Sequence, residues 1–157
     1  MSLAEVAAKQ SIPKKSGTNY DLIHAGKFND LLQYSLPHPL RTDPVLGKLF
    51  LRDHLNLTGM QVSLNKLPAH ISVPFYHKHN ANEELYIFIK GKGQIQIDGD
   101  SIDVEEGTCV RVSPAGERTW RNNSDEDLFY IVIQAKVASL GADTFEDGIP
   151  GDRPVTW

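Results

Sequence analysis

The sequence predicts an all-β domain, a barrel or sandwich of short strands preceded by short helical segments. From Gly47 onward, runs of β-branched and aromatic residues alternate with turn-forming residues at short intervals, which is typical of small β-barrels. Within this region the pair Asp98-Gly99 is a strong signal for a tight hairpin. A length of 157 residues suits one domain with a substantial core.

The first 45 residues are expected to form an arm outside the barrel. Residues 4–10 favour a short helix, and apolar positions within residues 20–32 favour a second one, interrupted at Gly26. Three prolines then favour irregular or extended backbone: Pro37, Pro39 and Pro44. The barrel itself is assigned to residues 46–138.

The barrel strands follow from short apolar or alternating runs between turn signals. They are predicted at residues 48–54, 60–66, 85–89, 94–97, 101–104, 108–112, 118–121 and 128–137. Residues 139–157 form a tail rich in Gly, Pro and Asp. Its large apolar side chains, Phe145 and Trp157, would be exposed unless the tail packs on the barrel or on a partner subunit. We expect one of these two arrangements.

Composition argues against several classes of partner. The chain has 16 basic and 20 acidic residues, a near balance that suggests neither a nucleic-acid nor a membrane surface. No apolar run is long enough to span a bilayer, and no signal peptide pattern is seen at the start. The single cysteine, Cys109, cannot form an internal disulfide. These observations predict a cytoplasmic location.

Two histidines and a carboxylate are spaced as metal ligands. In extended backbone, alternate side chains share a face, so His77 and His79 are expected to point the same way. Glu83 and Glu84 follow after a short polar loop. A hairpin would return a carboxylate beside the two rings and place two nitrogens and one oxygen around one point.

The spacing His77-x-His79-x4-Glu84-x6-Gly91 resembles the first motif of the cupin superfamily. This resemblance covers roughly residues 45–137 and implies a double-stranded β-helix, the jelly-roll barrel that usually carries a central metal. It selects Glu84 rather than Glu83 as the ligand. It therefore implies a divalent ion, Zn, Fe, Mn or Ni, held by His77, His79 and Glu84, and a homodimer.

The second cupin motif is degenerate in this chain. That motif resembles Gly-x5-Pro-x-Gly-x2-His-x3-Asn and normally supplies another histidine to the metal. With Gly107 and Asn122 as anchors, the histidine position falls on Arg118. With the Pro-Ala-Gly segment as the anchor, it falls on Thr119. We favour Arg118, because two flanking anchors agree and loops absorb a one-residue shift more easily than paired strands do.

An arginine at this position changes the chemistry in one of two ways. Arg118 cannot donate a lone pair to a metal, so it either competes for Glu84 or points its guanidinium at a carboxylate or phosphate of a ligand. Another residue could take the place of the missing histidine ligand, which we call the vacant corner of the metal site. Spacing alone does not decide among three candidates: His54, His70 and Tyr76.

Aromatic residues near the motifs are candidates for a ligand pocket. Tyr86 and Phe88 share a strand face with Glu84, and Trp120 lies two residues after Arg118. Together with Arg118 they are predicted to bind a ligand, although core packing is the competing interpretation for the aromatic side chains. Four residues are candidates for proton transfer: Tyr76, Tyr86, Tyr130 and Lys66.

Three functions are compatible with these residues. The favoured one is a metal-binding small cupin that binds or acts on a small, anionic or sugar-like molecule. If it is an enzyme, it is a metal-dependent isomerase or oxygenase. The alternatives are a non-catalytic ligand sensor and a metal-free structural barrel. The superfamily hosts many reactions on one scaffold, so the sequence does not select among substrates.

Overall fold

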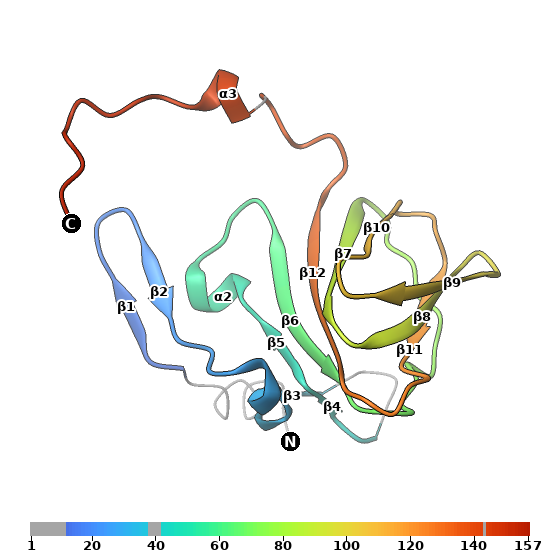
Figure 1. Ribbon diagram of the computed structural model, residues 1–157. Helices are drawn as coiled ribbons and strands as arrows, with labels where there is room; N and C mark the ends of the chain where they lie inside the picture. The colour runs from blue at the N-terminus through green and yellow to red at the C-terminus, as the bar shows by residue number, and fades with distance from the viewer. Residues whose placement is uncertain (1–11, 38–41, 143) are drawn as a thin grey trace.

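The computed structural model describes residues 12–37, 42–142 and 144–157. The helix predicted at residues 4–10 lies outside these ranges. Two antiparallel sheets face each other and form an all-β barrel, as predicted (Figure 1). No helix within the described ranges has the length and apolar character needed to cross a membrane.

The barrel strands are short and closely connected. The larger sheet contains, in spatial order, β10 (Cys109–Val112), β7 (Asn82–Lys90), β12 (Leu128–Lys136), β6 (Gln61–Leu67) and β5 (Lys48–Phe50). The smaller sheet contains β11 (Arg118–Arg121), β8 (Lys92–Ile97) and β9 (Asp100–Glu105). All of the predicted strands from residue 60 onward coincide with strands of the structure.

The two turns that flank β8 need special backbone conformations. Asp98 and Gly99 have φ angles of 50° and 94° and connect β8 to β9, with Ile97 paired to Asp100. Two left-handed residues are what a two-residue hairpin of this kind requires. Gly91, between β7 and β8, has a φ of 88°, and a side chain there would collide with the carbonyl oxygen of Asp127. The motif glycine therefore has a structural role.

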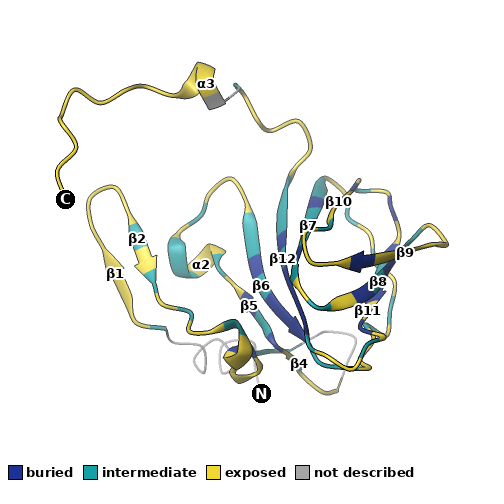
Figure 2. Cartoon of the chain, in the orientation of Figure 1, coloured by how far each residue is buried: buried dark blue, intermediate teal, exposed yellow. Residues whose placement is uncertain are grey.

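The core lies between the two sheets. Its buried members are Leu67, Tyr86, Phe88, Ile95, Val104, Val112, Trp120, Leu128, Tyr130 and Val132. Figure 2 shows buried segments concentrated in the barrel strands, whereas the C-terminal segment is exposed. Alternation explains this distribution, because every second side chain of a strand faces inward.

The N-terminal segment packs on the outside of the larger sheet. It forms a hairpin of β1 (Lys14–Ser16) and β2 (Asp21–Ile23), the 3-10 helix η1 (Phe28–Gln33), and β3 (Ser35–Leu36) paired with β4 (Val45–Leu46). A second, smaller core joins it to β5 through three buried side chains: Leu31, Tyr34 and Leu49.

Two predicted elements of this region are wrong in part. The helix expected over residues 20–32 is instead β2 followed by η1, because residues 21–23 pair with β1 and Gly26 turns the chain with a φ of 83°. The strand expected over residues 48–54 stops at Phe50. The chain then forms the short helix α2 (Arg52–Leu55), which ends at Asn56 in the left-handed conformation.

The C-terminal tail does not pack on its own barrel. It contains α3 (Thr144–Asp147) and extends away from the end of β12 (Figure 1). The side chains of Leu140, Ile149 and Val155 are 87%, 92% and 78% exposed. Of the two arrangements expected for the tail, only contact with a partner subunit stays a prediction.

Candidate metal centre

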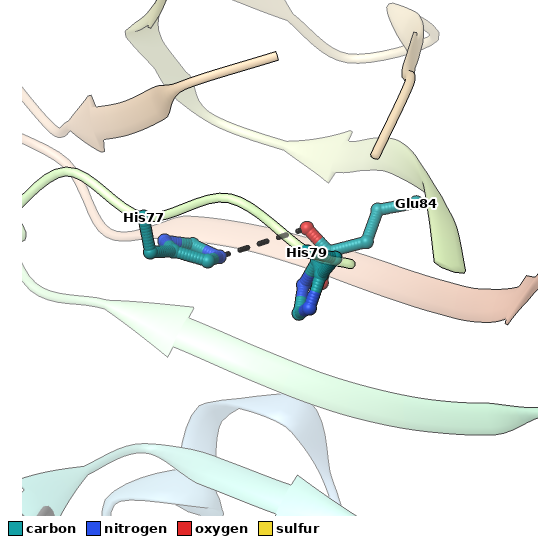
Figure 3. Close-up of side chains that lie close together, drawn as sticks. All are labelled: His77, His79 and Glu84. Atoms are coloured by element: carbon teal, nitrogen blue, oxygen red, sulfur yellow. Dashed lines mark ion pairs between the residues drawn. The ribbon is translucent and has the colours of Figure 1, made fainter. Parts of the chain in front are cut away.

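The structure brings the three predicted metal ligands together. His77 and His79 lie on the extended segment before β7, and the backbone of His77 pairs with that of Arg118 on β11 through N–O contacts of 3.1 and 3.0 Å. Both histidines are half-buried, whereas Lys78 between them is exposed. Glu84 projects from β7, so the three side chains point toward one another (Figure 3). The ligand atoms all lie within 4.8 Å of one another.

These three groups fit a divalent ion. His79 Nε2 lies 3.0 Å from Glu84 Oε1, and His77 Nε2 lies 3.8 Å from Glu84 Oε2. Ligand atoms about 2.1 Å from one ion can be at most about 4.2 Å apart, so small side-chain movements suffice to close the site. Two imidazole nitrogens and a carboxylate oxygen are a donor set for zinc or first-row transition metals.

The ring of His77 is oriented without a hydrogen bond to its second nitrogen. Within the part of the chain that the structure describes, His77 Nδ1 is buried and has no hydrogen-bond partner. Metal-bound histidines usually donate this second N–H to a protein oxygen. Here the backbone pairing with Arg118 and the packing against Trp120, at a ring distance of 5.8 Å, fix the ring instead.

Arg118 faces inward, as the favoured register predicts, and is bonded to Glu84. Its side chain is fully buried, and its Nε and Nη2 atoms donate to Glu84 Oε2 at 3.1 and 2.6 Å. Tyr86 donates to the same oxygen at 2.6 Å. Oε2 thus accepts three hydrogen bonds, while Oε1 faces His79.

The predicted contact between Arg118 and a ligand is not supported by this arrangement. The third nitrogen of the guanidinium donates to the carbonyl oxygen of Gly116 at 2.9 Å, and the side chain does not line the cavity described below. A buried guanidinium with all of its groups engaged cannot receive a ligand. Of the two alternatives for Arg118, the structure shows the competition for Glu84.

The electrostatics keep Glu84 charged. Burial alone would raise the pKa of its carboxyl group. The nearby ring of His77, hydrogen bonds from Tyr86 and Arg118, and the guanidinium charge more than offset this effect and hold the pKa far below its ordinary value. The carboxylate is therefore ionised at neutral pH and available as a ligand.

The two buried tyrosines remain neutral at physiological pH. Burial and the nearby charge of Glu84 raise the pKa of Tyr86 well above its ordinary value. Burial likewise raises the pKa of Tyr130, whose hydroxyl accepts a hydrogen bond of 2.8 Å from Trp120 Nε1. Their raised pKa values argue against both candidates as proton acceptors.

None of the three residues considered for the vacant corner occupies it. His70 pairs with Asp125 at 2.9 Å on the surface. His54 lies on α2, outside the barrel strands. The hydroxyl of Tyr76 donates to the side chain of Gln96.

Gln134 occupies this corner instead, and it is a residue that the sequence analysis missed. It lies on β12 directly opposite Glu84 on β7. Its Nε2 atom is 3.0 Å from His79 Nε2 and 3.1 Å from Glu84 Oε1. The alternation along β12, which places Tyr130 and Val132 inside, is the signal that would have found it.

A cavity of about 790 Å³ adjoins the three metal ligands. Of the three aromatic residues predicted to bind a ligand, Tyr86 and Trp120 contribute to its wall, whereas Phe88 does not. The ring of Phe88 packs in the core against Tyr130 at a centroid distance of 5.7 Å. We call the side that carries His77, His79 and Glu84 the carboxylate wall.

Another part of the cavity wall carries an amine, and we call Lys48 and Asn65 the amine wall. The two residues pair across β5 and β6, and Lys48 Nζ donates to Asn65 Oδ1 at 3.0 Å. No carboxylate of the described residues lies within 4.0 Å of this amine. Burial lowers the pKa of Lys48 to about 8, although Glu84 opposes the effect.

Lys66, a predicted proton-transfer candidate, also lines the cavity but is already paired. Its amine lies 2.8 Å from the carboxylate of Asp127 and donates to the carbonyl oxygen of Asn29 at 3.0 Å. These two contacts hold the amine of Lys66 in place, away from a ligand in the cavity. Lys48 differs because its partner is a neutral amide.

Comparison with known proteins agrees with this geometry. The cupin domain family matches residues 66–134. A cupin protein from Bacteroides fragilis is 38% identical over 74% of this chain and 97% of its own, with a TM-score of 0.65. The plu4264 protein from Photorhabdus luminescens, 20% identical over 57% of this chain and 74% of its own with a TM-score of 0.52, supports the fold alone. No protein of curated function matches. The domain match and the Bacteroides relative together show that this chain belongs to the cupin family.

Proposed function

We propose that this cupin holds a divalent metal ion at His77, His79 and Glu84 and binds a small anionic molecule in the adjoining cavity. The observation that carries this proposal is the contrast between the two walls. The carboxylate wall presents metal ligands, and the amine wall presents a cation that has no carboxylate partner among the described residues. This amine belongs to a half-buried side chain at a cavity, and charges withdrawn from water are normally paired, so it is a site for an anion.

The size and lining of the cavity support a small organic ligand. Its volume of about 790 Å³ lies within the range of known small-molecule sites, about 300–1,000 Å³. Aromatic and aliphatic side chains form much of its wall, including Tyr86, Trp120 and Val132. Such a wall excludes water and strengthens the polar contacts that fix the ligand's orientation.

In this proposal, each residue of the site has a distinct role in binding the metal or the ligand. When bound, a divalent ion supplies Lewis-acid polarisation of a ligand oxygen, the chemistry that metal-dependent cupin reactions need. Glu84 provides the negative charge for the ion, and Arg118 and Tyr86 fix its carboxylate. Lys48, which lines the same cavity, would bind a carboxylate or phosphate of the ligand. With a pKa of about 8, its amine is also suited to accept a proton.

One observation favours a second candidate, a metal-free ligand-binding barrel. The guanidinium of Arg118 lies 2.6 Å from Glu84 Oε2 and already neutralises the carboxylate. In that case the amine wall alone would select the ligand, and the histidines would contribute only hydrogen bonds.

Elemental analysis separates the two candidates. Protein purified without chelator and without a nickel column should contain close to one equivalent of a transition metal per chain. The His77→Ala variant should lose it, and the surface variant His70→Ala should keep it. A wild-type protein that neither contains metal nor takes up added Zn²⁺, Mn²⁺, Ni²⁺ or Fe²⁺ would contradict the metal proposal.

We also propose that the protein forms a homodimer in which the tail contacts the partner subunit. The support is the exposure of apolar side chains along the tail, such as Leu140 and Ile149. Exposed apolar groups of this kind commonly mark an interaction surface.

A further inference from the structure

Three polar atoms lie close together in the metal site, which lacks the histidine of the second cupin motif: His79 Nε2, Glu84 Oε1 and Gln134 Nε2. The His79 Nε2 to Glu84 Oε1 distance is 3.0 Å, and Gln134 Nε2 lies 3.0 Å from the first atom and 3.1 Å from the second. The three atoms form a nearly equilateral triangle. Each belongs to a different strand or segment, so the barrel itself imposes the triangle.

Hydrogen bonds cannot satisfy all three sides of this triangle at once. If His79 Nε2 carries a hydrogen, it donates to Glu84, but it then faces the donor nitrogen of Gln134. If His79 Nε2 carries none, it accepts from Gln134, but two acceptors then face each other at 3.0 Å. One contact is repulsive in either tautomer. Glu84 Oε2 accepts from two nitrogens of Arg118 and from Tyr86, the contacts of a carboxylate without a proton, so Glu84 supplies no hydrogen that would relieve the conflict.

A metal ion removes the conflict if the amide of Gln134 turns over. A half-turn exchanges the amide nitrogen and oxygen and places Oε1 at the third corner. All three atoms then present lone pairs. Ligand atoms held about 2.1 Å from one ion lie about 3.0 Å apart at right angles and about 3.4 Å apart at tetrahedral angles, so the sides of the triangle are within a few tenths of an ångström of either arrangement. Without a cation, the same half-turn would set two oxygens against each other.

Asn82 allows the amide to turn without losing its other hydrogen bond. It lies on β7, two residues before Glu84 and on the same strand face. Its Nδ2 donates to Gln134 Oε1 at 3.1 Å, and within the described residues this is its one side-chain hydrogen bond. If both amides turn, Asn82 Oδ1 accepts from the Gln134 amide and the pair remains bonded.

We propose that Gln134 is a further metal ligand, through its amide oxygen, and that the Gln134 and Asn82 amides turn together when the metal binds. This inference rests on the metal site of the proposed function. Gln134 thus takes the coordination role that Arg118 cannot fill. The paired amides make the site a hydrogen-bond donor without the metal and an oxygen ligand with it.

Titration of metal-free protein with Zn²⁺ tests the ligand role. By calorimetry, Gln134→Leu should bind zinc about 10- to 100-fold more weakly than the wild type. Gln134→Glu keeps an oxygen ligand and should bind at least as tightly as the wild type. The matched control is Gln61→Leu, because Gln61 pairs with Gln134 across β6 and β12 but bonds to the backbone of Arg52. This control should keep the wild-type affinity.

Side-chain amide resonances of the unaltered protein test the turn directly. Added Zn²⁺ should shift the ¹⁵N resonances of Gln134 and Asn82 together and leave those of Gln94, on β8, in place. Equal zinc affinity of wild type and Gln134→Leu, or unchanged Gln134 and Asn82 resonances in zinc-loaded protein, would overturn this inference while leaving the metal proposal intact. Failure of the wild type to bind zinc would instead contradict the metal proposal on which the inference rests.

Discussion

The carboxylate wall and the amine wall face the same cavity but differ in whether their charged groups have a partner of opposite charge. On the carboxylate wall, Glu84 has a guanidinium at 2.6 Å and a phenol at 2.6 Å. On the amine wall, Lys48 donates to the neutral amide of Asn65, and no carboxylate of the described residues completes the pair. The first wall is electrically balanced without a ligand, whereas the second becomes balanced only when an anion arrives. In the proposed function, the amine of Lys48 therefore recognises the anion, while Arg118 and Tyr86 hold Glu84 in place for the metal.

The largest expected effect comes from unbalancing the carboxylate wall. Arg118→Met leaves the buried carboxylate of Glu84 without its cation and should lower the free energy of unfolding by about 3–5 kcal/mol. Urea denaturation measures this loss. Added zinc should restore part of the stability, because the ion replaces the missing positive charge.

Arg111→Met is the control for this variant, since it removes a guanidinium from an exposed pair. Arg111 bonds to Glu83 at the barrel surface, and its loss should cost less than about 1 kcal/mol. Equal losses for the two variants would show that Arg118 adds nothing beyond a surface ion pair.

Metal binding should have the next largest effect. Zinc at about 100 times its dissociation constant should stabilise the wild type by about 2.7 kcal/mol. His79→Ala should abolish this gain, because His79 supplies one of the ligand nitrogens. Thermal denaturation with zinc or with chelator provides the measurement. If the His79→Ala variant kept the full zinc-dependent increase in melting temperature, His79 would not be a zinc ligand.

The amine wall predicts a smaller, pH-dependent effect. The amine of Lys48 has a pKa of about 8 in the folded protein against 10.5 in the reference state. Between these values the unfolded chain binds more protons, so the free energy of unfolding should rise as the pH rises from 8 toward 10. Lys48→Met should lack this component, a difference on the order of 1 kcal/mol after solvent screening.

Denaturation of the wild type and Lys48→Met at several pH values isolates this component, because all other groups are common to both proteins. Parallel pH profiles would mean that Lys48 titrates as an ordinary exposed lysine. Lys90→Met serves as the control, since Lys90 is exposed on β7 and does not line the cavity.

Removal of the C-terminal tail is expected to have the smallest effect on the stability of the barrel. Removal of residues 139–157 should change the free energy of unfolding of the monomer by less than about 0.5 kcal/mol, because the apolar side chains described there, such as Leu140, Ile149 and Val155, are exposed. The same truncation should dissociate the proposed homodimer. Light scattering of the full-length and shortened chains measures the mass of each, and a dimer that survives truncation would place the interface elsewhere.

Much of the fold could be predicted because the barrel strands carry strong local signals. The Asp98-Gly99 turn fixes one hairpin, and the spacing from His77 to Gly91 fixes the arrangement of the first motif. The N-terminal segment carried weaker signals. Its apolar residues fit a helix period, but pairing between β1 and β2 and packing of η1 on β5 decided its conformation.

The metal ligands could be predicted because they lie close together in sequence, whereas their partners could not. Gln134 is 50 residues from Glu84 along the chain and becomes its neighbour only through the register of β12 with β7. A shift of one residue in that register would have turned Gln134 outward. The role of Arg118 was equally inaccessible, because burial decides between a carboxylate partner and a ligand.

The short edge strand β5 has a consequence for how the ligand preference of this protein can evolve. The region shared with the cupin domain, residues 66–134, includes His77, His79, Glu84 and Gln134, whereas Lys48 lies before it. In the proposed function, the ion is therefore bound entirely by residues of the matched region, whereas one group that binds the anion, Lys48, lies before it. Substitutions in β5 should then alter the anion that is bound without removing a metal ligand.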